Sequence, residues 1–272
     1  MRIAIIGGSG QMGRWFAAFF KRKGHSVVIN GRDAKKLAKT AKALGVEYAK
    51  DPAEAVRGAK LVMISVLPHD LERALKAVAP HLDSHQRVID VTSVKVHPVS
   101  LMHRYIKGPV TLGTHPMFGP SAPARGQNFI LTPTNRRERE FAAKLGRTLA
   151  NYGFTVYITT PERHDAAIGY ILSLTHFIGF VTADTWKHLK IEKYLHTSST
   201  SFRFLLQFAK SVVDSDPELY SYLQMEVPTT SRAESLFVSK ADAWARLMRR
   251  KERKKFKSRM SELSAYLDKL RP

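Results

Sequence analysis

The first half of the chain alternates short apolar runs with amphipathic segments. Apolar runs rich in β-branched residues predict strands, and helical spacing of apolar residues predicts the helices between them. The expected strands lie at residues 3–7, 25–31, 60–67, 87–93, 110–115, 128–133 and 154–159, and the first expected helices at 13–23, 34–44 and 69–79. This alternation is typical of βαβ units, which predicts an α/β domain with a doubly wound, mostly parallel sheet and helices on both faces.

The pattern changes near residue 160. Thr159 and Thr160 precede Pro161 and Glu162, a typical helix start with proline at the first helical position. Helical spacing then continues at 164–189, 201–214, 217–226 and 233–270, with breaks near residues 216–217 and 227–228. We therefore expect two closely packed domains, an α/β domain at 1–160 and an all-α domain at 161–272.

Composition excludes several kinds of chemistry. The chain has no cysteine, so disulfides, thiolate nucleophiles and cysteine-ligated metals are excluded, and we expect no metal site. No uninterrupted apolar run approaches the roughly 18 residues of a membrane span, and the opening residues resemble a strand more than a signal peptide. We expect a cytoplasmic protein without a membrane segment.

The chain is strongly basic, with 44 Lys and Arg against 23 Asp and Glu and a net charge of +21. Such a field attracts polyanions, including phosphorylated cofactors, carboxylates and nucleic acid. The densest basic run lies at residues 246–257, where apolar spacing predicts a helix. We interpret this run as a solvated helix face, with a polyanion-binding patch as the alternative. We do not expect nucleic-acid binding, since no nucleic-acid motif accompanies the run.

A glycine-rich loop after the first strand fits the pattern G-x-G-x-x-G and opens a helix, which is the setting of a dinucleotide-binding site. The glycines permit a tight turn, close approach of the pyrophosphate and packing of the helix on the sheet, while the helix N-terminus faces the phosphates. The residues expected at this cofactor site are Gly8, Ser9, Gly10, Gln11, Met12 and Gly13, joined by Ser65, Leu67 and Pro68 from the turn after the strand at 60–67.

The end of the second strand indicates which cofactor is preferred. An acidic residue there would bind the ribose of NAD and repel a 2′-phosphate, but the chain has Asn30 at that position and Arg32 shortly after it. A guanidinium can bind a phosphate through two hydrogen bonds, so we predict NADP. The alternative is that Arg32 is a solvated loop residue and Asp33 caps the next helix, which leaves NAD possible.

Two of the 11 histidines stand out as candidates for chemistry. Histidine is the commonest general base near neutral pH, and oxidation of a hydroxyl compound requires such a base. His115 comes just after the apolar core of the expected strand, VTLG at residues 110–113, in a loop stiffened by prolines. His176 lies within an otherwise apolar helix, where it needs a polar partner or a ligand. The alternatives are a loop-bracing role for His115 and a hydrogen-bonded core position for His176.

Several short motifs follow one another along the chain, at residues 7–13 (GGSGQMG), 90–95 (DVTSVK), 115–120 (HPMFGP), 130–133 (ILTP), 162–165 (ERHD), 174–176 (LTH) and 216–220 (DPELY). With these motifs in this order, the chain resembles the prephenate dehydrogenase family, which includes the arogenate-using enzymes of tyrosine biosynthesis. The resemblance implies an N-terminal Rossmann domain and a helical domain that forms a homodimer, with the active site in the cleft between them.

The resemblance also implies NADP-dependent oxidative decarboxylation of prephenate to 4-hydroxyphenylpyruvate. By the resemblance, His115 accepts the hydroxyl proton, Ser93 binds the same oxygen or orients the imidazole, and His176 lines the substrate pocket. Lys95 adds positive charge near the carboxylate substrate. A helix cap is the alternative for Ser93. Alternative functions are oxidation of arogenate or another carboxylated hydroxy compound, and non-catalytic, NADP-responsive binding.

One position departs from the family pattern. Family members carry an arginine five residues before the Asp-Pro turn that holds the substrate ring carboxylate, and this chain has Ser211 there. A serine cannot form a charged, two-point contact. Lys210 points about 100° away from that helix position, whereas Arg203 lies about two turns earlier near the same face. Arg203 is therefore our first candidate for the carboxylate contact and Lys210 the second.

Overall fold

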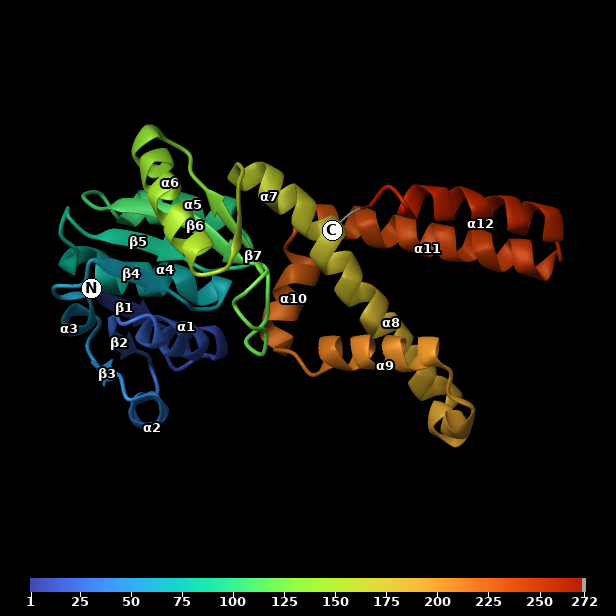
Figure 1. The fold of residues 1–272 in the computed structure, drawn as a ribbon, viewed down its shortest axis with the longest axis horizontal. Coiled ribbons are helices and arrows are strands. Elements are labelled where there is room, and N and C mark those ends of the chain that lie inside the picture. The colour runs from blue at the N-terminus through green and yellow to red at the C-terminus, as the bar shows by residue number, and fades with distance from the viewer. Residues whose placement is uncertain (271–272) are drawn as a thin grey trace.

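The computed structural model describes residues 1–270, and its first half forms one eight-stranded sheet (Figure 1). The strand order is β3-β2-β1-β4-β5-β6-β7-β8, and only the β6–β7 pair is antiparallel. The strands are β1 (Arg2–Ile6), β2 (Ser26–Asn30), β3 (Glu47–Tyr48), β4 (Leu61–Ile64), β5 (Arg87–Asp90), β6 (Val110–Pro116), β7 (Asn128–Thr132) and β8 (Thr155–Ile158). The predicted doubly wound, mostly parallel sheet is confirmed.

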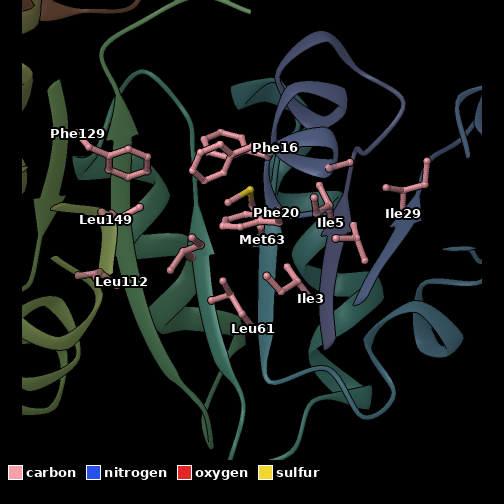
Figure 2. Close-up of a cluster of buried hydrophobic side chains, with 14 of the residues drawn as sticks. Ile3, Ile5, Phe16, Phe20, Ile29, Leu61, Met63, Leu112, Phe129 and Leu149 are labelled. Carbon is pink, nitrogen blue, oxygen red and sulfur yellow. The ribbon is translucent and has the colours of Figure 1, made fainter. Parts of the chain in front are cut away.

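Successive side chains of the strands point to opposite faces of the sheet and pack into two hydrophobic layers. Ile3 and Ile5 face a layer covered by α1, α2 and α6, whereas Ala4 and Ile6 face a layer covered by α3, α4 and α5 (Figure 2 shows part of the first layer). The helices are α1 (Gln11–Arg22), α2 (Ala34–Leu44), α3 (Pro52–Val56), η1 (Pro68–Asp70), α4 (Leu71–Val78), η2 (Ala79–His81), α5 (Val96–Tyr105) and α6 (Arg136–Asn151). The sheet is thus buried on both faces, as a parallel sheet requires.

Residues 161–267 form the helical part of the molecule. Its helices are α7 (Pro161–Ile168), the π-helical turn η3 (Gly169–Ser173), α8 (Leu174–Leu189), η4 (Ile191–Thr197), α9 (Thr200–Val213), α10 (Pro217–Met225), α11 (Pro228–Arg249) and α12 (Arg253–Leu267). Thr160 caps α7, with its hydroxyl accepting from the Arg163 amide at 3.3 Å, which is the helix start expected from the sequence.

The run α7–η3–α8 is one long rod, visible in Figure 1 as the diagonal helix. The rod has 29 residues and its most apolar 18-residue window has a mean hydropathy of 1.6, so by length and composition alone it is long and apolar enough to cross a membrane. The sequence shows no uninterrupted apolar run here, because polar residues interrupt the apolar ones along the rod. Only 28% of its most apolar window is buried within the chain, which leaves an apolar face uncovered.

The structure corrects the expected single helix at 233–270. The chain turns back at Lys251, whose φ is 57°, and α11 and α12 form an antiparallel hairpin that projects from the body (Figure 1). Trp244 and Phe256 meet edge to face across this hairpin, with ring centroids 5.4 Å apart. The basic run therefore surrounds a turn, where its charges are solvated, rather than following one continuous helix.

A buried ion pair crosses from the end of β5 to the start of α5. The Lys95 ammonium contacts the Asp90 carboxylate and donates to the Thr114 carbonyl at 2.6 Å, and both charged side chains are fully buried. The amides of Thr92 and Thr114 donate to the same carboxylate at 3.0 and 3.2 Å. Burial lowers the pKa of Lys95, and the charge of Asp90 opposes that fall. The pair thereby fixes the β5–α5 loop against β6.

We predict that Lys95→Met destabilises the protein by about 3–5 kcal/mol, because it leaves the Asp90 carboxylate buried without its counter-charge. The measurement is the free energy of unfolding by denaturant titration. Lys76→Met is the matched control, since Lys76 forms an exposed ion pair with Glu72 and its removal should change stability little. Equal effects of the two substitutions would contradict a structural role for the buried pair.

Candidate active site

The glycine loop between β1 and α1 leaves no room for a side chain at Gly8 or Gly13. The Gly8 amide donates to the Asn30 carbonyl at 2.8 Å, which ties the loop to the end of β2. A Cβ on Gly8 would lie 2.5 Å from Cβ of Ile29, and one on Gly13 would lie 2.3 Å from the Gly7 carbonyl oxygen. Such a cradle, opening at the N-terminus of a 12-residue helix, fits the pyrophosphate of a dinucleotide.

Other residues expected at the cofactor site lie on the same edge of the sheet. Ser9 is buried, Gln11 is exposed and Met12 is half-buried. Ser65 follows β4 closely, since its amide donates to the Ile6 carbonyl at 2.7 Å. Leu67 and Pro68 begin η1 directly after it. The structure thus brings the glycine loop and the turn after β4 together at the carboxyl ends of β1 and β4.

The two residues expected to select the cofactor have different partners. The Asn30 side-chain amide donates to the carbonyls of Ala49 and Lys50, both at 3.0 Å, so both of its hydrogens are engaged in joining β2 to the segment after β3. Arg32 is exposed and pairs with Asp70 at 2.7 Å. Asn30 therefore has a structural role that the sequence did not suggest, while Arg32 lies at the open edge.

His115 lies at the end of β6 and is almost completely buried. Its Nδ1 is 2.9 Å from Nε2 of His164, and Nδ1 of His164 is 2.7 Å from the Asp165 carboxylate. Both partners come from α7, so the chain of hydrogen bonds crosses from the α/β domain to the helical part. Histidine, histidine and aspartate thus form a continuous polar row.

The hydrogen-bond row determines where the protons sit when both rings are neutral. A carboxylate only accepts, so Nδ1 of His164 carries its proton and Nε2 of His164 accepts. Nδ1 of His115 must then donate, which leaves Nε2 of His115 with a free lone pair. Within residues 1–270, no protein group hydrogen-bonds that atom. His115 is therefore held in the tautomer that can accept a proton at Nε2.

Asp165 also caps helix α5. Its two carboxylate oxygens accept from the backbone amides of Lys95 and Val96, at 2.7 and 2.8 Å. Helix α5 has no capping side chain of its own, so a carboxylate from α7 satisfies its first amides and interacts favourably with its dipole. The residue that orients His164 therefore also joins the two parts of the molecule.

The electrostatic surroundings favour the neutral form of His115. Burial, followed by the nearby His164 and Lys95, holds the pKa of His115 well below 6.5. A neutral imidazole is the form that accepts a proton, so this environment leaves His115 able to accept one at neutral pH and in mild acid.

His176 lies near the start of α8, with its ring stacked on Tyr220 of α10 at a centroid distance of 4.0 Å. It is buried, and within the described part of the chain its Nδ1 has no hydrogen-bond partner. Burial lowers the pKa of His176 to about 4. A neutral ring with an unsatisfied nitrogen is suited to a ligand that brings its own polar group, and the alternative of a hydrogen-bonded core histidine does not describe this side chain.

Ser93 and Lys95 lie in or next to the loop between β5 and α5, close in sequence to the α5 cap. Ser93 is half-buried, and among residues 1–270 no hydrogen bond joins its hydroxyl to His115. Lys95 does not present its ammonium to a substrate, since that group is enclosed with Asp90. The expected contact of Lys95 with a carboxylate substrate is replaced here by an internal ion pair that lies behind His115.

The expected carboxylate-binding cations lie on α9. Arg203 and Lys210 are exposed, and Lys210 pairs with Asp214 at 3.1 Å. In the described chain neither side chain forms a hydrogen bond or ion pair with His115 or His176. The hydroxyl of Ser211 donates to the Phe208 carbonyl of its own helix at 2.7 Å. The structure therefore does not assemble a cationic carboxylate site from these residues within one chain.

Sequence reasoning did not assign a role to His164 or Asp165. Both lie in the motif at residues 162–165, which contributed to the family resemblance. The available sign of a role was that a histidine and an aspartate are adjacent at the start of the helix that follows the sheet. Their partner His115 is 49 residues earlier in the chain, so the contact itself could not be read from spacing.

Two family models match the chain. The nucleotide-binding domain of prephenate dehydrogenase matches residues 16–158, and the dimerization domain of prephenate dehydrogenase matches residues 160–262. A probable arogenate/prephenate dehydrogenase of Methanocaldococcus jannaschii is 32% identical over 271 residues, covering 98% of this chain and 61% of that protein. The T-protein of Haemophilus influenzae is 26% identical over 227 residues, covering 83% of this chain and 56% of that protein. The chain thus spans about three fifths of the length of these relatives.

Solved structures have the same fold. The prephenate dehydrogenase of Aquifex aeolicus, solved with hydroxyphenyl propionate and NAD+, superposes with a TM-score of 0.81 at 20% identity, covering 98% of this chain and 96% of that one. Synechocystis arogenate dehydrogenase superposes with a TM-score of 0.75 at 22% identity, covering 99% of each chain. The two matched domains together cover most of the chain, and the chain belongs to the prephenate dehydrogenase family.

Proposed function

We propose that this protein catalyses the NADP-dependent oxidative decarboxylation of prephenate to 4-hydroxyphenylpyruvate, with arogenate as the alternative substrate. The observation that carries the proposal is the row His115–His164–Asp165, which leaves a free lone pair on a buried imidazole. The glycine cradle on the same edge of the sheet supports a nicotinamide dinucleotide, and Arg32 supports NADP over NAD. Family membership supports the substrate class.

In the proposed reaction, Nε2 of His115 accepts the proton of the ring hydroxyl while its Nδ1 proton stays hydrogen-bonded to His164. The imidazolium that forms is stabilised through His164 by the Asp165 carboxylate. A nicotinamide dinucleotide would be held by the glycine loop and the turn after β4, and it would supply the acceptor for the hydride that leaves the hydroxyl carbon. Loss of the ring carboxylate as carbon dioxide leaves its bonding electrons in the ring, and the proton on His115 can return to the phenol oxygen.

His176 supports the proposal as a substrate-facing group from the helical part. Its ring is kept neutral by burial, and its stacking on Tyr220 fixes the plane of the imidazole. We propose that its free nitrogen binds a polar group of the substrate, and that Ser93 contacts the reacting oxygen once substrate is present. Arg203 and Lys210 remain our candidates for the ring carboxylate in place of the arginine that Ser211 replaces.

The test is steady-state kinetics of the purified protein with prephenate and arogenate, each against NAD and NADP. We expect reduced cofactor to form with prephenate and NADP, and kcat/KM to fall by about 10²–10⁴-fold in His115→Asn, because the general base is lost. His81→Asn, at an exposed histidine of the same domain, is the matched control and should keep full activity. Absence of turnover with all four pairs, together with unchanged cofactor binding in His115→Asn, would rule out the proposal.

The pH dependence tests the hydrogen-bond row. Since the pKa of His115 lies well below 6.5, the base is unprotonated at pH 6.5 and the acidic limb of kcat/KM should lie below that pH. His164→Gln removes a neighbour that lowers the pKa of His115, so the limb should move to higher pH while kcat falls. His81→Gln should leave the profile unchanged. A wild-type limb above pH 6.5, or no displacement in His164→Gln, would contradict this role of His164.

We also propose that the protein works as a homodimer formed through the helical part. Its matched domain is described as a dimerization domain, and the α7–α8 rod exposes an apolar face to solvent. Large apolar residues are exposed on neighbouring helices too, including Phe204 on α9 and Leu236 on α11. An apolar surface of this kind is typical of a subunit interface.

Light scattering of the purified protein measures this association. We expect twice the chain mass of 30.6 kDa, and a shift toward the monomer in Phe204→Glu, which places a charge on the helical surface where the side chain is 70% exposed. Tyr157→Glu, at a residue 52% exposed on β8, should remain dimeric. A monomeric wild-type protein at all accessible concentrations would exclude the dimer.

A further inference from the structure

Two arginines converge on one carboxylate beside the glycine loop. Arg32 Nη2 lies 2.7 Å from one Asp70 oxygen and Arg32 Nη1 lies 3.4 Å from the other, while Arg73 contacts that second oxygen. The Asp70 side chain is only 11% exposed, whereas those of Arg32 and Arg73 are 72% and 62% exposed. The carboxylate is thus an internal anchor, and the guanidinium groups remain open to solvent.

The position of this cluster in the fold connects it to the cofactor site. Arg32 follows β2, and Asp70 and Arg73 follow the turn after β4. Strands β2 and β4 are the two neighbours of β1, so the ion pair spans the carboxyl end of β1, where the glycine loop begins. In this fold class a dinucleotide binds at that edge of the sheet.

The charges of the cluster do not balance. Two guanidinium groups face one carboxylate, and His69 Nε2 lies 3.8 Å from the same carboxylate. The neighbouring acid, Asp33, is engaged in capping α2 by accepting from the Lys36 amide at 2.9 Å. One uncompensated positive charge therefore remains. One arginine is enough to neutralise the mostly buried Asp70 carboxylate, so charge pairing alone does not account for the second arginine.

We infer that Arg32 and Arg73, held in position by Asp70, form the binding site for the 2′-phosphate of NADP, and that Arg73 is a second determinant of cofactor choice. The inference rests on the nicotinamide cofactor of the proposed function. A guanidinium has five N–H donors, so each arginine retains donors for a phosphate after contacting Asp70. Because the carboxylate already holds both side chains, less conformational freedom is lost when the phosphate binds.

The test uses isothermal titration calorimetry without substrate, with 2′,5′-ADP as the probe that carries a 2′-phosphate and 5′-AMP as the probe that lacks it. We expect Arg73→Gln and Arg32→Gln each to weaken binding of 2′,5′-ADP by about tenfold, the loss of one charge-assisted contact, and to change 5′-AMP binding less than about twofold. Arg73→Lys, which keeps the charge but not the two-point geometry, should fall between wild type and Arg73→Gln.

Arg57→Gln is the matched control, since Arg57 is an exposed arginine at the end of α3 and should affect neither probe. Equal loss of affinity for both probes in Arg73→Gln, or no loss for either, would overturn the inference.

Because binding of the probes requires no turnover, the outcome of this experiment is separate from that of the proposed function. Selective loss of 2′,5′-ADP in a protein inactive with prephenate and arogenate would support the phosphate site and reject the substrate. Turnover of prephenate or arogenate, with a preference between NADP and NAD that Arg73→Gln leaves unchanged, would support the substrate and reject the phosphate site.

Discussion

The carboxylate of Asp165 is the interaction on which the arrangement of the site depends. It accepts three hydrogen bonds, from the imidazole of His164 and from the first amides of α5. One group thus orders a proton-accepting row, completes a helix that lacks its own cap, and joins the helical part to the sheet. A neutral amide at this position would accept hydrogen bonds more weakly than the carboxylate does. It would also carry no negative charge to stabilise a positive charge on the histidines.

A buried ion pair lies next to the strand that carries His115. The Asp90–Lys95 pair lies directly behind β6, where Lys95 holds the carbonyl of Thr114, the residue before His115. Such a pair contributes less to stability than to geometry, because much of its Coulomb attraction offsets the cost of removing two charges from water. It also places a positive group near His115 without exposing it, and that group disfavours a second positive charge on the imidazole.

The sequence predicted the features that arise from local chemistry. The strand alternation, the glycine loop and the start of α7 at Pro161 follow from short stretches of residues. His115, expected in a loop after a strand, instead lies inside β6, because its backbone pairs with Ile130 of the antiparallel strand β7. Three helices of the first domain were not identified, although Asp51 and Asn135 cap two of them with side-chain hydrogen bonds. The turn at Lys251 was missed because helical spacing continues on both sides of it.

What the sequence could not predict depends on contacts between distant segments. Asn30 occupies the expected strand end, but its hydrogens are engaged by Ala49 and Lys50, which spacing does not reveal. The family resemblance implied that Lys95 lies near the substrate, and only the three-dimensional position of Asp90 explains its burial. The relation of Arg32 to Asp70 and Arg73 likewise appears only when the loops after β2 and β4 are brought together.

The rod formed by α7, η3 and α8 has a mechanical consequence. His164, Asp165 and His176 all lie on it, and the same helix carries the largely uncovered apolar face. The residues that orient His115 and the buried His176 therefore belong to one continuous helical element, and the π-helical turn between them is its natural point of bending. A bend at this turn changes the distance between His176 and the row His115–His164–Asp165, so the geometry of the turn sets how far apart the two halves of the site lie.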